Sequence, residues 1–299
     1  MYKHEQLAEA LAALVEATGN YRCLRRLDFD DMPSIDEATS MDEIVAIVDV
    51  ETTGLDRRKD TIIELAIRLI AISPDGWIVG IGRPMAWLED PGTGLTPDIT
   101  RLTGLTDADL AGKHIDDDDA TAALQQATLI VSHNARFDRP FLEDRLAMAA
   151  LRPWACSLTD INWRQLGFEG RSLSHLLSQC GWFSSNASHR AGADVDMLIA
   201  LLGHILPNGR TVALELMEAS RRPSYRIEAV GANYNVKDTL KSRGYRWNPV
   251  TRVWWREIAE ADRDAELDWL EVNVYAAEAE ARCSEPIVHA LTAATRHRS

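Results

Sequence analysis

The sequence predicts an α/β fold in which a mixed sheet is flanked by helices, and three observations support this prediction. An uninterrupted apolar run, Ile44–Val48, is typical of a buried central strand. Segments with strand-like and helix-like patterns then alternate over residues 41–207. The composition, with 46% hydrophobic and 26% charged residues, is that of a globular protein, so collagen-like, low-complexity and disordered classes are excluded.

Residues 1–40 are expected to form an N-terminal helical segment and a linker, because Leu7, Leu11 and Leu14 recur at helical spacing ahead of an Asp-rich stretch. Within 41–207, apolar runs and turn residues predict strands at 44–48, 61–72, 77–81 and 128–132. Helical periodicity predicts helices at 119–127, 141–150, 173–180 and 195–206. The segment 208–222, which follows Pro207, is expected to be a helical linker.

A small basic, aromatic-rich α+β module is predicted at 223–282. Its expected elements are a strand at 225–230, a helix at 236–242, a hairpin formed by 245–247 and 253–255, and a last helix from 259 to about 281. The whole chain has a net charge of −14, yet residues 221–258 contain nine Lys or Arg and three Asp or Glu. Such a basic segment in an acidic protein requires a local explanation. Residues 283–299 are expected to be a disordered tail.

Carboxylates and one histidine follow the predicted strands. Asp49 and Glu51 end the first strand and, because strand side chains alternate, point to the same face. Two such carboxylates repel each other, and burying both is costly unless a cation lies between them. Asp138 follows the 128–132 strand, while His189 and Asp194 open the last helix of the domain. Each acid taken singly could be an ordinary solvated side chain or helix cap, but the combination favours a metal site.

These residues resemble the histidine-containing branch of the DEDD superfamily of 3′–5′ exonucleases, which includes the epsilon proofreading subunit of DNA polymerase III, ribonuclease T and oligoribonuclease. The first motif, Asp-x-Glu-Thr-x-Gly, lies at Asp49–Gly54, and the second, Asn-x-x-Phe-Asp, at Asn134–Asp138. The third, His-x-x-x-x-Asp, lies at His189–Asp194. The resemblance implies a ribonuclease H-like sheet in residues 41–207.

The resemblance also implies a two-metal site that holds Mg²⁺ or Mn²⁺, which prefer hard oxygen ligands. Asp49 would bridge both ions, Glu51 and Asp194 would complete one site, and Asp138 would act on the second ion, partly through water. His189 would be the general base. The terminal nucleotide would be held by residues of the first two motifs and of the loop between them: Thr52 and Thr53 through backbone contacts, Leu102 and Thr103 through packing, and Asn134.

The function implied is a metal-dependent 3′–5′ exonuclease that releases mononucleotides from the 3′ ends of single-stranded DNA. Two alternatives stay open: an exonuclease for RNA or short oligoribonucleotides, and a nucleic-acid-binding replication or repair subunit. The motifs do not distinguish ribose from deoxyribose, because recognition of the 2′-OH depends on local geometry. A polymerase or repair protein is an expected partner class, although the polymerase-binding tail of the epsilon subunit is not recognisable in this chain.

The basic module has two interpretations. Its tryptophans could form the core of a small domain, since alternation places Trp254 and Trp255 on opposite strand faces. Alternatively, the module contacts nucleic acid, with one aromatic side chain such as Trp247 stacked on a base and cations that follow phosphates. The predicted cations are Lys237, Lys241, Arg243, Arg246, Arg252 and Arg256.

The sequence predicts a cytoplasmic protein. Its four cysteines are scattered without a Cys-x-x-Cys pair, which indicates a reduced compartment and no structural zinc. No apolar run approaches the roughly 18 residues needed to span a bilayer, and the charged N-terminus lacks the apolar core of a secretory signal. Membrane association is therefore not expected.

Overall fold

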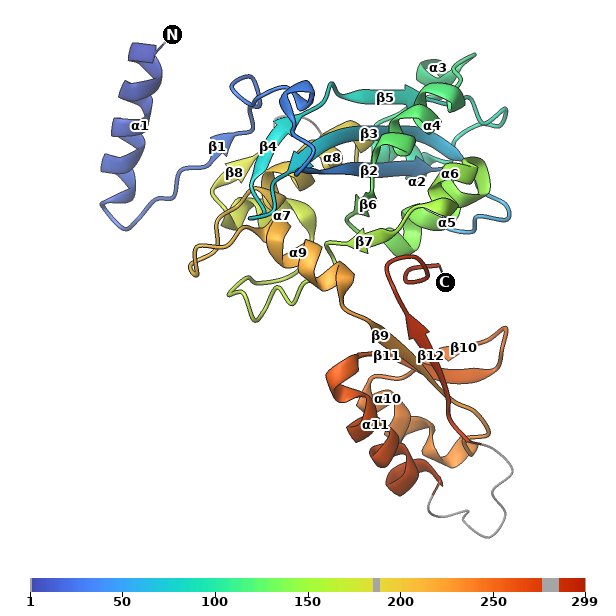
Figure 1. The fold of residues 1–299 in the computed structure, drawn as a ribbon. Coiled ribbons are helices and arrows are strands. Elements are labelled where there is room, and N and C mark those ends of the chain that lie inside the picture. The colour runs from blue at the N-terminus through green and yellow to red at the C-terminus, as the bar shows by residue number, and fades with distance from the viewer. Residues whose placement is uncertain (1, 185–188, 276–284, 299) are drawn as a thin grey trace. The chain divides into compact units, whose positions relative to one another are not determined.

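The computed structural model describes residues 2–184, 189–275 and 285–298 (Figure 1). The chain divides into two compact units. Unit 1 comprises Met1–Met217 together with His297–Ser299, and unit 2 comprises Glu218–Arg296. No helix among the described residues is long and apolar enough to cross a membrane.

Unit 1 is built on a six-stranded mixed sheet with the order β4-β3-β2-β6-β7, in which β5 also pairs with β3. β2, β6 and β7 are parallel, whereas β3 is antiparallel to β2, β4 and β5. The predicted α/β class with a mixed sheet is therefore confirmed. The strands are β2 (Glu43–Thr52), β3 (Ile62–Ile72), β4 (Ile78–Ile81), β5 (Met85–Leu88), β6 (Leu129–Ser132) and β7 (Trp154–Cys156).

Helices cover both faces of this sheet (Figure 1). A separate two-stranded parallel pair joins β1 (Arg25–Arg26) to β8 (Trp182–Phe183), so residues 25–26 belong to unit 1 rather than to a free linker. The helices of the chain up to the unit boundary are α1 (Tyr2–Glu16), α2 (Pro97–Thr103), α3 (Asp107–Leu110), α4 (Asp117–Gln126), α5 (Ala135–Arg145), α6 (Ala147–Leu151), α7 (Leu173–Gln179), α8 (Ala191–Leu202) and α9 (Val212–Arg221).

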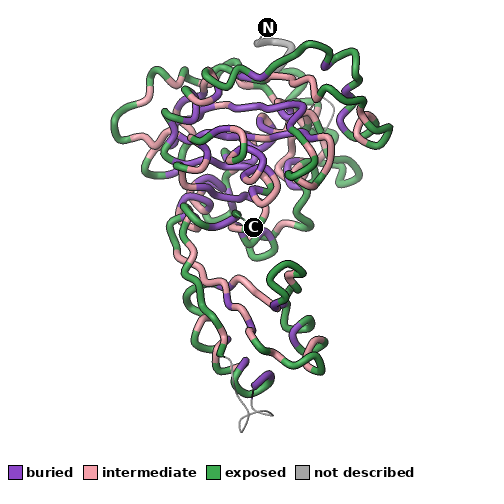
Figure 2. Tube along the Cα trace, turned by 90° about the vertical axis from the view of Figure 1, so that its right-hand side faces the viewer, coloured by how far each residue is buried: buried purple, intermediate pink, exposed green. Residues whose placement is uncertain are grey.

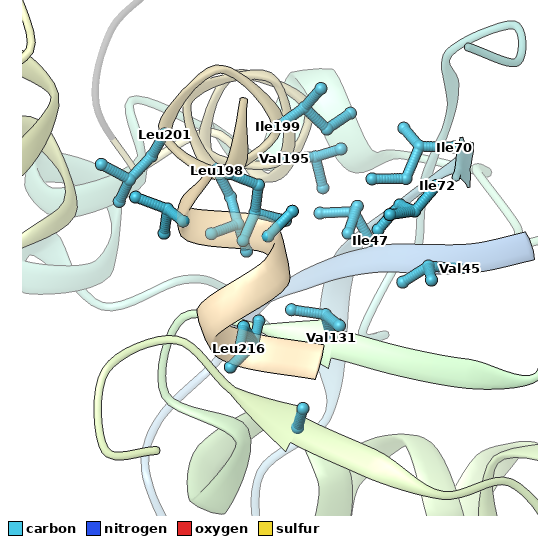
Figure 3. Packing of buried hydrophobic residues seen from close by; sticks show 14 of the residues in the cluster. Val45, Ile47, Ile70, Ile72, Val131, Val195, Leu198, Ile199, Leu201 and Leu216 are labelled. Atoms are coloured by element: carbon cyan, nitrogen blue, oxygen red, sulfur yellow. The ribbon is translucent and has the colours of Figure 1, made fainter. Parts of the chain in front are cut away.

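β2 has an apolar sequence because it is covered on both faces. On one face, Val45 and Ile47 pack in a cluster with Val195 and Leu198 of α8 (Figure 3). On the other face, Ala46 and Val48 pack against residues of α4 and α5. Figure 2 shows that the buried residues are concentrated in these central strands and the helices around them. The ends of β2 are therefore fixed rigidly against α8 and α5.

Two segments differ in detail from the predicted chain organisation. The segment 208–222 contains the helix α9, as predicted, and the boundary between the units lies within it, but Val212, Leu216 and Met217 are buried in the core of unit 1. The described part of the predicted disordered tail forms strand β12 (Ile287–Leu291), which pairs with β9, and His297 is buried. Both segments are held by tertiary contacts that their local sequence does not indicate.

Unit 2 is an antiparallel four-stranded sheet with the order β10-β11-β9-β12. Its core contains Ile227, Leu240, Tyr245 and Leu270, so helices and strands share one small hydrophobic cluster. The predicted strand, short helix and hairpin are confirmed, whereas residues 276–281 of the predicted last helix lie outside the described residues. The elements are β9 (Ser224–Ala229), α10 (Lys237–Arg243), β10 (Arg246–Asn248), β11 (Val253–Ala259), α11 (Arg263–Leu270), a further turn over Glu271–Tyr275, and β12.

Candidate active site

The end of β2 provides two carboxylates on one face of the sheet. In the β2–β3 pairing, Asp49 lies opposite Ala66 and Glu51 lies opposite Glu64, and the register shifts immediately after Glu51. Asp49 and Glu51 follow the odd-numbered side chains of β2, which face α8. Glu51 is only 9% exposed, so its carboxylate is largely withdrawn from water.

Asp138 reaches the same place from the other side of the sheet. Its helix, α5, begins directly after Asn134, whose φ of 127° is rare for a residue with a side chain. Asp138 is 2% exposed, and its Oδ1 accepts a hydrogen bond from the backbone N–H of Val50 at 3.2 Å. Because Val50 lies between Asp49 and Glu51, this bond fixes the second motif directly to the first.

His189 and Asp194 come from the beginning of α8. His189 has the left-handed φ of 67°, so the chain turns sharply just before the helix. One ligand atom each of Glu51, His189 and Asp194 lies within 4.8 Å of the other two. The three sequence motifs, of which the first and third are more than 130 residues apart, therefore meet at one end of β2.

Burial and mutual repulsion raise the pKa values of all four carboxyl groups. Burial raises the pKa of Asp49 well above its usual range, and the charges of Asp138 and Asp194 raise it further. Burial, followed by the charges of Asp194 and Glu64, raises the pKa of Glu51 to about 8. Burial likewise raises the pKa of Asp138 to about 7 and that of Asp194 to about 6. A cluster of this kind is destabilised by its own negative charge, and a bound cation would relieve it.

The donor set fits a divalent metal ion. Carboxylate oxygens with raised pKa values and one imidazole are grouped where a cation would be bound by hard ligands. The grouping of Glu51, His189 and Asp194 is compatible with binding of such an ion.

The loop after Glu51 is shaped by hydrogen bonds of the first motif. The Thr52 hydroxyl donates to the Gly54 carbonyl at 2.5 Å, and the Thr53 hydroxyl donates to Asp60 at 3.2 Å. A Cβ atom on Gly54 would lie 2.5–2.6 Å from the Asp60 carboxylate, so this close approach requires glycine. The hydroxyls of both threonines are thus engaged within the protein.

Leu102 and Thr103 differ in the structure, although both were predicted to hold substrate. Leu102 is 48% exposed at the end of α2 and remains accessible. Thr103 is 1% exposed, and its hydroxyl donates to the Ile99 carbonyl at 3.0 Å and accepts from the Leu105 N–H at 3.1 Å. Thr103 therefore ends the helix, which corrects the prediction of a direct substrate contact. Asn134 is exposed, and its side chain makes no helix-capping hydrogen bond.

Two residues near this site were not predicted from the sequence. Glu64 of β3 is buried opposite Glu51, and its carboxylate accepts hydrogen bonds from the Arg190 guanidinium. Glu64 lies inside an apolar strand pattern and Arg190 inside the third motif, so neither stands out by spacing. The sole signal was an acid placed in an otherwise buried strand.

The predicted nucleic-acid contacts of the basic module lie in unit 2. Arg243 and Arg256 both form ion pairs with the buried carboxylate of Glu266, at 3.0 and 2.9 Å. These two arginines hold α10 and β11 to α11, so their charges are already paired within unit 2, and a phosphate contact by either stays a prediction. Lys237, Lys241, Arg246, Trp247 and Arg252 are considered below.

Parts of the chain are similar to known proteins. DNA polymerase III subunit epsilon of Treponema pallidum (strain Nichols) is 29% identical over 179 residues, which cover 55% of this chain and 79% of that protein. Ribonuclease T of Yersinia enterocolitica serotype O:8 / biotype 1B is 26% identical over 120 residues, which cover 36% of this chain and 55% of that protein. A solved structure of exonuclease X in complex with 5′ overhanging duplex DNA is 23% identical, with a TM-score of 0.44, over 58% of this chain and 98% of that one.

A family model described as an exonuclease matches residues 46–202, which is more than half of the 299-residue chain. The matched range contains Asp49, Glu51, Asp138, His189 and Asp194. The chain therefore belongs to this exonuclease family and is a 3′–5′ exonuclease of the DEDD superfamily.

Proposed function

We propose that the protein hydrolyses single-stranded DNA from its 3′ end and releases mononucleotides, with two divalent ions and His189 as the general base. The observation that carries this proposal is the meeting of Glu51, His189 and Asp194 within 4.8 Å beside Asp49 and Asp138. Carboxylates brought from three distant segments into one buried cluster have no stabilising role of their own.

The four carboxylates are the proposed metal ligands. Asp49, whose carboxylate is repelled by the other three, would be a ligand of both ions, and Glu51 and Asp194 would complete the site of one of them. When bound, two Mg²⁺ or Mn²⁺ ions would supply an activated water and neutralise charge on the attacking and leaving oxygens. Asp138, which the Val50 N–H holds in position, would act on the second ion.

The remaining residues bind and orient the substrate. His189 accepts the proton of the attacking water, and its position just before α8 keeps the imidazole at the edge of the carboxylate cluster. The backbone of Thr52 and Thr53 and the exposed side chain of Leu102 are the proposed contacts of the terminal nucleotide. Asn134, four residues before Asp138, is exposed, and its side-chain amide is a further proposed contact.

RNA is the second candidate substrate, because a stretch of 120 residues is similar to a protein named ribonuclease T. The similarity to a polymerase subunit likewise makes a replication or repair protein the proposed class of partner. We place the protein in the cytoplasm, since the described cysteines are free and a reducing compartment is compatible with them.

The test uses oligonucleotides of one sequence as single-stranded DNA, duplex DNA and RNA, each labelled at the 5′ or the 3′ end. With Mg²⁺ or Mn²⁺, a 3′ label should appear at once as a mononucleotide, while a 5′ label should give a descending ladder. A larger kcat/KM for DNA than for RNA would identify DNA as the substrate, and the reverse would identify RNA. Products that begin at the 5′ end, or hydrolysis that continues in EDTA, would refute the proposal.

A further inference from the structure

We propose that unit 2 carries a separate binding surface for single-stranded nucleic acid, formed by a row of three aromatic rings and two lysines. We call it the aromatic–lysine row. It consists of Tyr234, Lys237, Lys241, Trp254 and Trp247, on α10, β10, β11 and the turn before α10 (Figure 1). The proposal goes beyond hydrolysis at the β2 end and does not depend on it.

The row is continuous. The Lys237 Nζ lies 2.6 Å from the Tyr234 hydroxyl and 4.0 Å from the centroid of its ring. Lys241 follows one helical turn later on the same side of α10, and its Nζ lies 5.9 Å from the Trp254 ring. Trp254 pairs across the hairpin with Trp247, and their ring centroids are 5.4 Å apart. The two lysines thus lie between the Tyr234 ring and the paired rings of Trp254 and Trp247.

Tyr234 and Trp247, the aromatic residues at the two ends of the row, do not belong to the hydrophobic core of unit 2. Tyr234 is 74% exposed and Trp247 is 47% exposed, whereas the core is filled by Tyr245, Tyr275 and aliphatic side chains. Trp254 is half-buried and packs against that core, so it supports Trp247 from below. Trp247 also lies on β10, an outer strand of the sheet, where another chain can approach. Exposed large aromatic side chains at such a position indicate a binding surface.

The charge of unit 2 supports the same surface. Other arginines of the basic segment are neutralised by carboxylates: Arg222 by Glu218, Arg226 by Glu228, and Arg243 and Arg256 by Glu266. Among the residues that the structure describes, no salt bridge engages Lys237, Lys241, Arg246 or Arg252. The charges left for a partner therefore lie in the row or in the β10–β11 hairpin next to it.

Flat rings on either side of two cations match the chemistry of a single strand, whose bases stack and whose phosphates are negative. An acidic peptide would use the four cations but has no flat groups for Tyr234 and Trp247. A duplex keeps its bases stacked inside and offers only phosphates. The row therefore fits single-stranded DNA or RNA better than either of these partners.

The experiment measures binding of the full chain to fluorescent dT20 and rU20 by anisotropy, in EDTA to prevent hydrolysis, at several salt concentrations. We expect Trp247→Ala to weaken binding about tenfold, since base stacking on one ring is worth about that factor. Trp247→Phe should retain most of the affinity. Replacing Lys237 and Lys241 together by Gln should reduce the salt dependence, by about one unit in the slope of log K against log salt.

Arg263→Gln is the matched control, because Arg263 is a cation of the same unit that pairs with Asp264 outside the row. It should bind like the wild type, and circular dichroism should show all variants folded. Wild-type affinity of both row variants at every salt concentration would overturn the proposal. Row-dependent binding of a glutamate-rich peptide, with no binding of dT20 or rU20, would identify a protein partner instead and also overturn it. Loss of hydrolysis with intact row-dependent binding would contradict the proposed function alone.

Discussion

Arg190 and Glu64 form a bidentate ion pair beside the carboxylate cluster. Arg190 Nε and Nη2 donate to the two Glu64 carboxylate oxygens at 3.0 and 3.1 Å, and the Ala191 N–H also donates to Glu64 at 3.2 Å. Glu64 lies opposite Glu51 in the sheet, and Arg190 directly follows His189. The pair therefore ties the turn that carries His189 to the strand next to Glu51.

Replacing Arg190 by Lys should lower kcat about tenfold or more while KM for a short oligonucleotide changes little. Lysine keeps the charge but cannot form the planar, bidentate hydrogen bonds of a guanidinium, so the turn that carries His189 loses its fixed position. Steady-state kinetics with single-stranded DNA would measure this. Arg83→Lys is the control, because Arg83 forms an exposed ion pair with Asp119 and should be tolerated. An unchanged kcat for Arg190→Lys would show that the pair is dispensable.

His189→Ala should keep the fold and the metal affinity but lose about 10²–10⁴ in turnover, which is the usual contribution of a general base. Because His189 lies within reach of Glu51 and Asp194, Mn²⁺ titration is the necessary companion measurement. A large loss of Mn²⁺ affinity in His189→Ala would indicate that His189 is a metal ligand and not the general base.

Asp49→Asn should abolish hydrolysis without unfolding the protein. In EDTA the variant should be at least as heat-stable as the wild type, because one charge of the repelling cluster is gone. Added Mn²⁺ should raise the melting temperature of the wild type more, since a ligand that binds only the folded state stabilises it. Thermal melts with and without Mn²⁺ provide the measurement. Undiminished nuclease activity in the variant would refute the assignment of the whole site.

The stability of the metal-free protein should fall as pH rises. Glu51, Asp138 and Asp194 have pKa values of about 8, 7 and 6 in the folded protein, whereas in an unfolded chain such groups titrate near 4. Between about pH 4 and pH 8 the folded state thus binds more protons than the unfolded state, and this contribution to stability is lost with rising pH.

Melting temperatures in EDTA between pH 5 and pH 8 would test this expectation. The fall should be smaller in Asp49→Asn, which lacks one group of the cluster, and stabilisation by Mn²⁺ should grow with pH because the ligands must be deprotonated. Equal pH dependence in both proteins would mean that the cluster does not control stability.

The sequence was sufficient to predict the centre of the fold and of the site. The run Ile44–Val48 is apolar because β2 is buried on both faces, and alternation along the same strand predicted that Asp49 and Glu51 share a side. These features are local, so they depend on neighbouring residues alone. The short strands β5 and β7 and the helices α2 and α3 were missed, because so few residues carry no clear periodicity.

What the sequence could not predict depends on distant partners. From the sequence, Arg243 was predicted to be a cation available to phosphates, but in the fold it is paired with the buried carboxylate of Glu266. Glu64 pairs with Arg190 across 126 residues of chain, and no spacing rule connects the two. The 287–291 segment becomes a strand only because β9 offers it an edge. In each case a tertiary contact determines the role of a residue whose local pattern is ordinary.

Gly54→Ala should disturb the loop that is proposed to hold the terminal nucleotide. The added methyl would lie 2.5–2.6 Å from the Asp60 carboxylate, which accepts hydrogen bonds from the Thr53 hydroxyl and the Asp56 N–H. Either the loop or Asp60 must move, and overpacking of this kind costs about 1–3 kcal/mol. We expect a lower melting temperature and about tenfold lower kcat/KM, chiefly through a higher KM.

Gly94→Ala provides a matched comparison for this substitution. A methyl on Gly94 would meet its nearest neighbour, the Asp107 carboxylate, at 3.6 Å, which is ordinary van der Waals contact, so stability and kinetics should stay at wild-type values. Melting curves and initial rates on a short single-stranded oligonucleotide would be recorded for both variants. If Gly54→Ala matched the wild type in melting temperature and KM, the Gly54–Asp60 contact would not determine the shape of the loop. Equal damage in both variants would point to a general intolerance of alanine in the loops of unit 1.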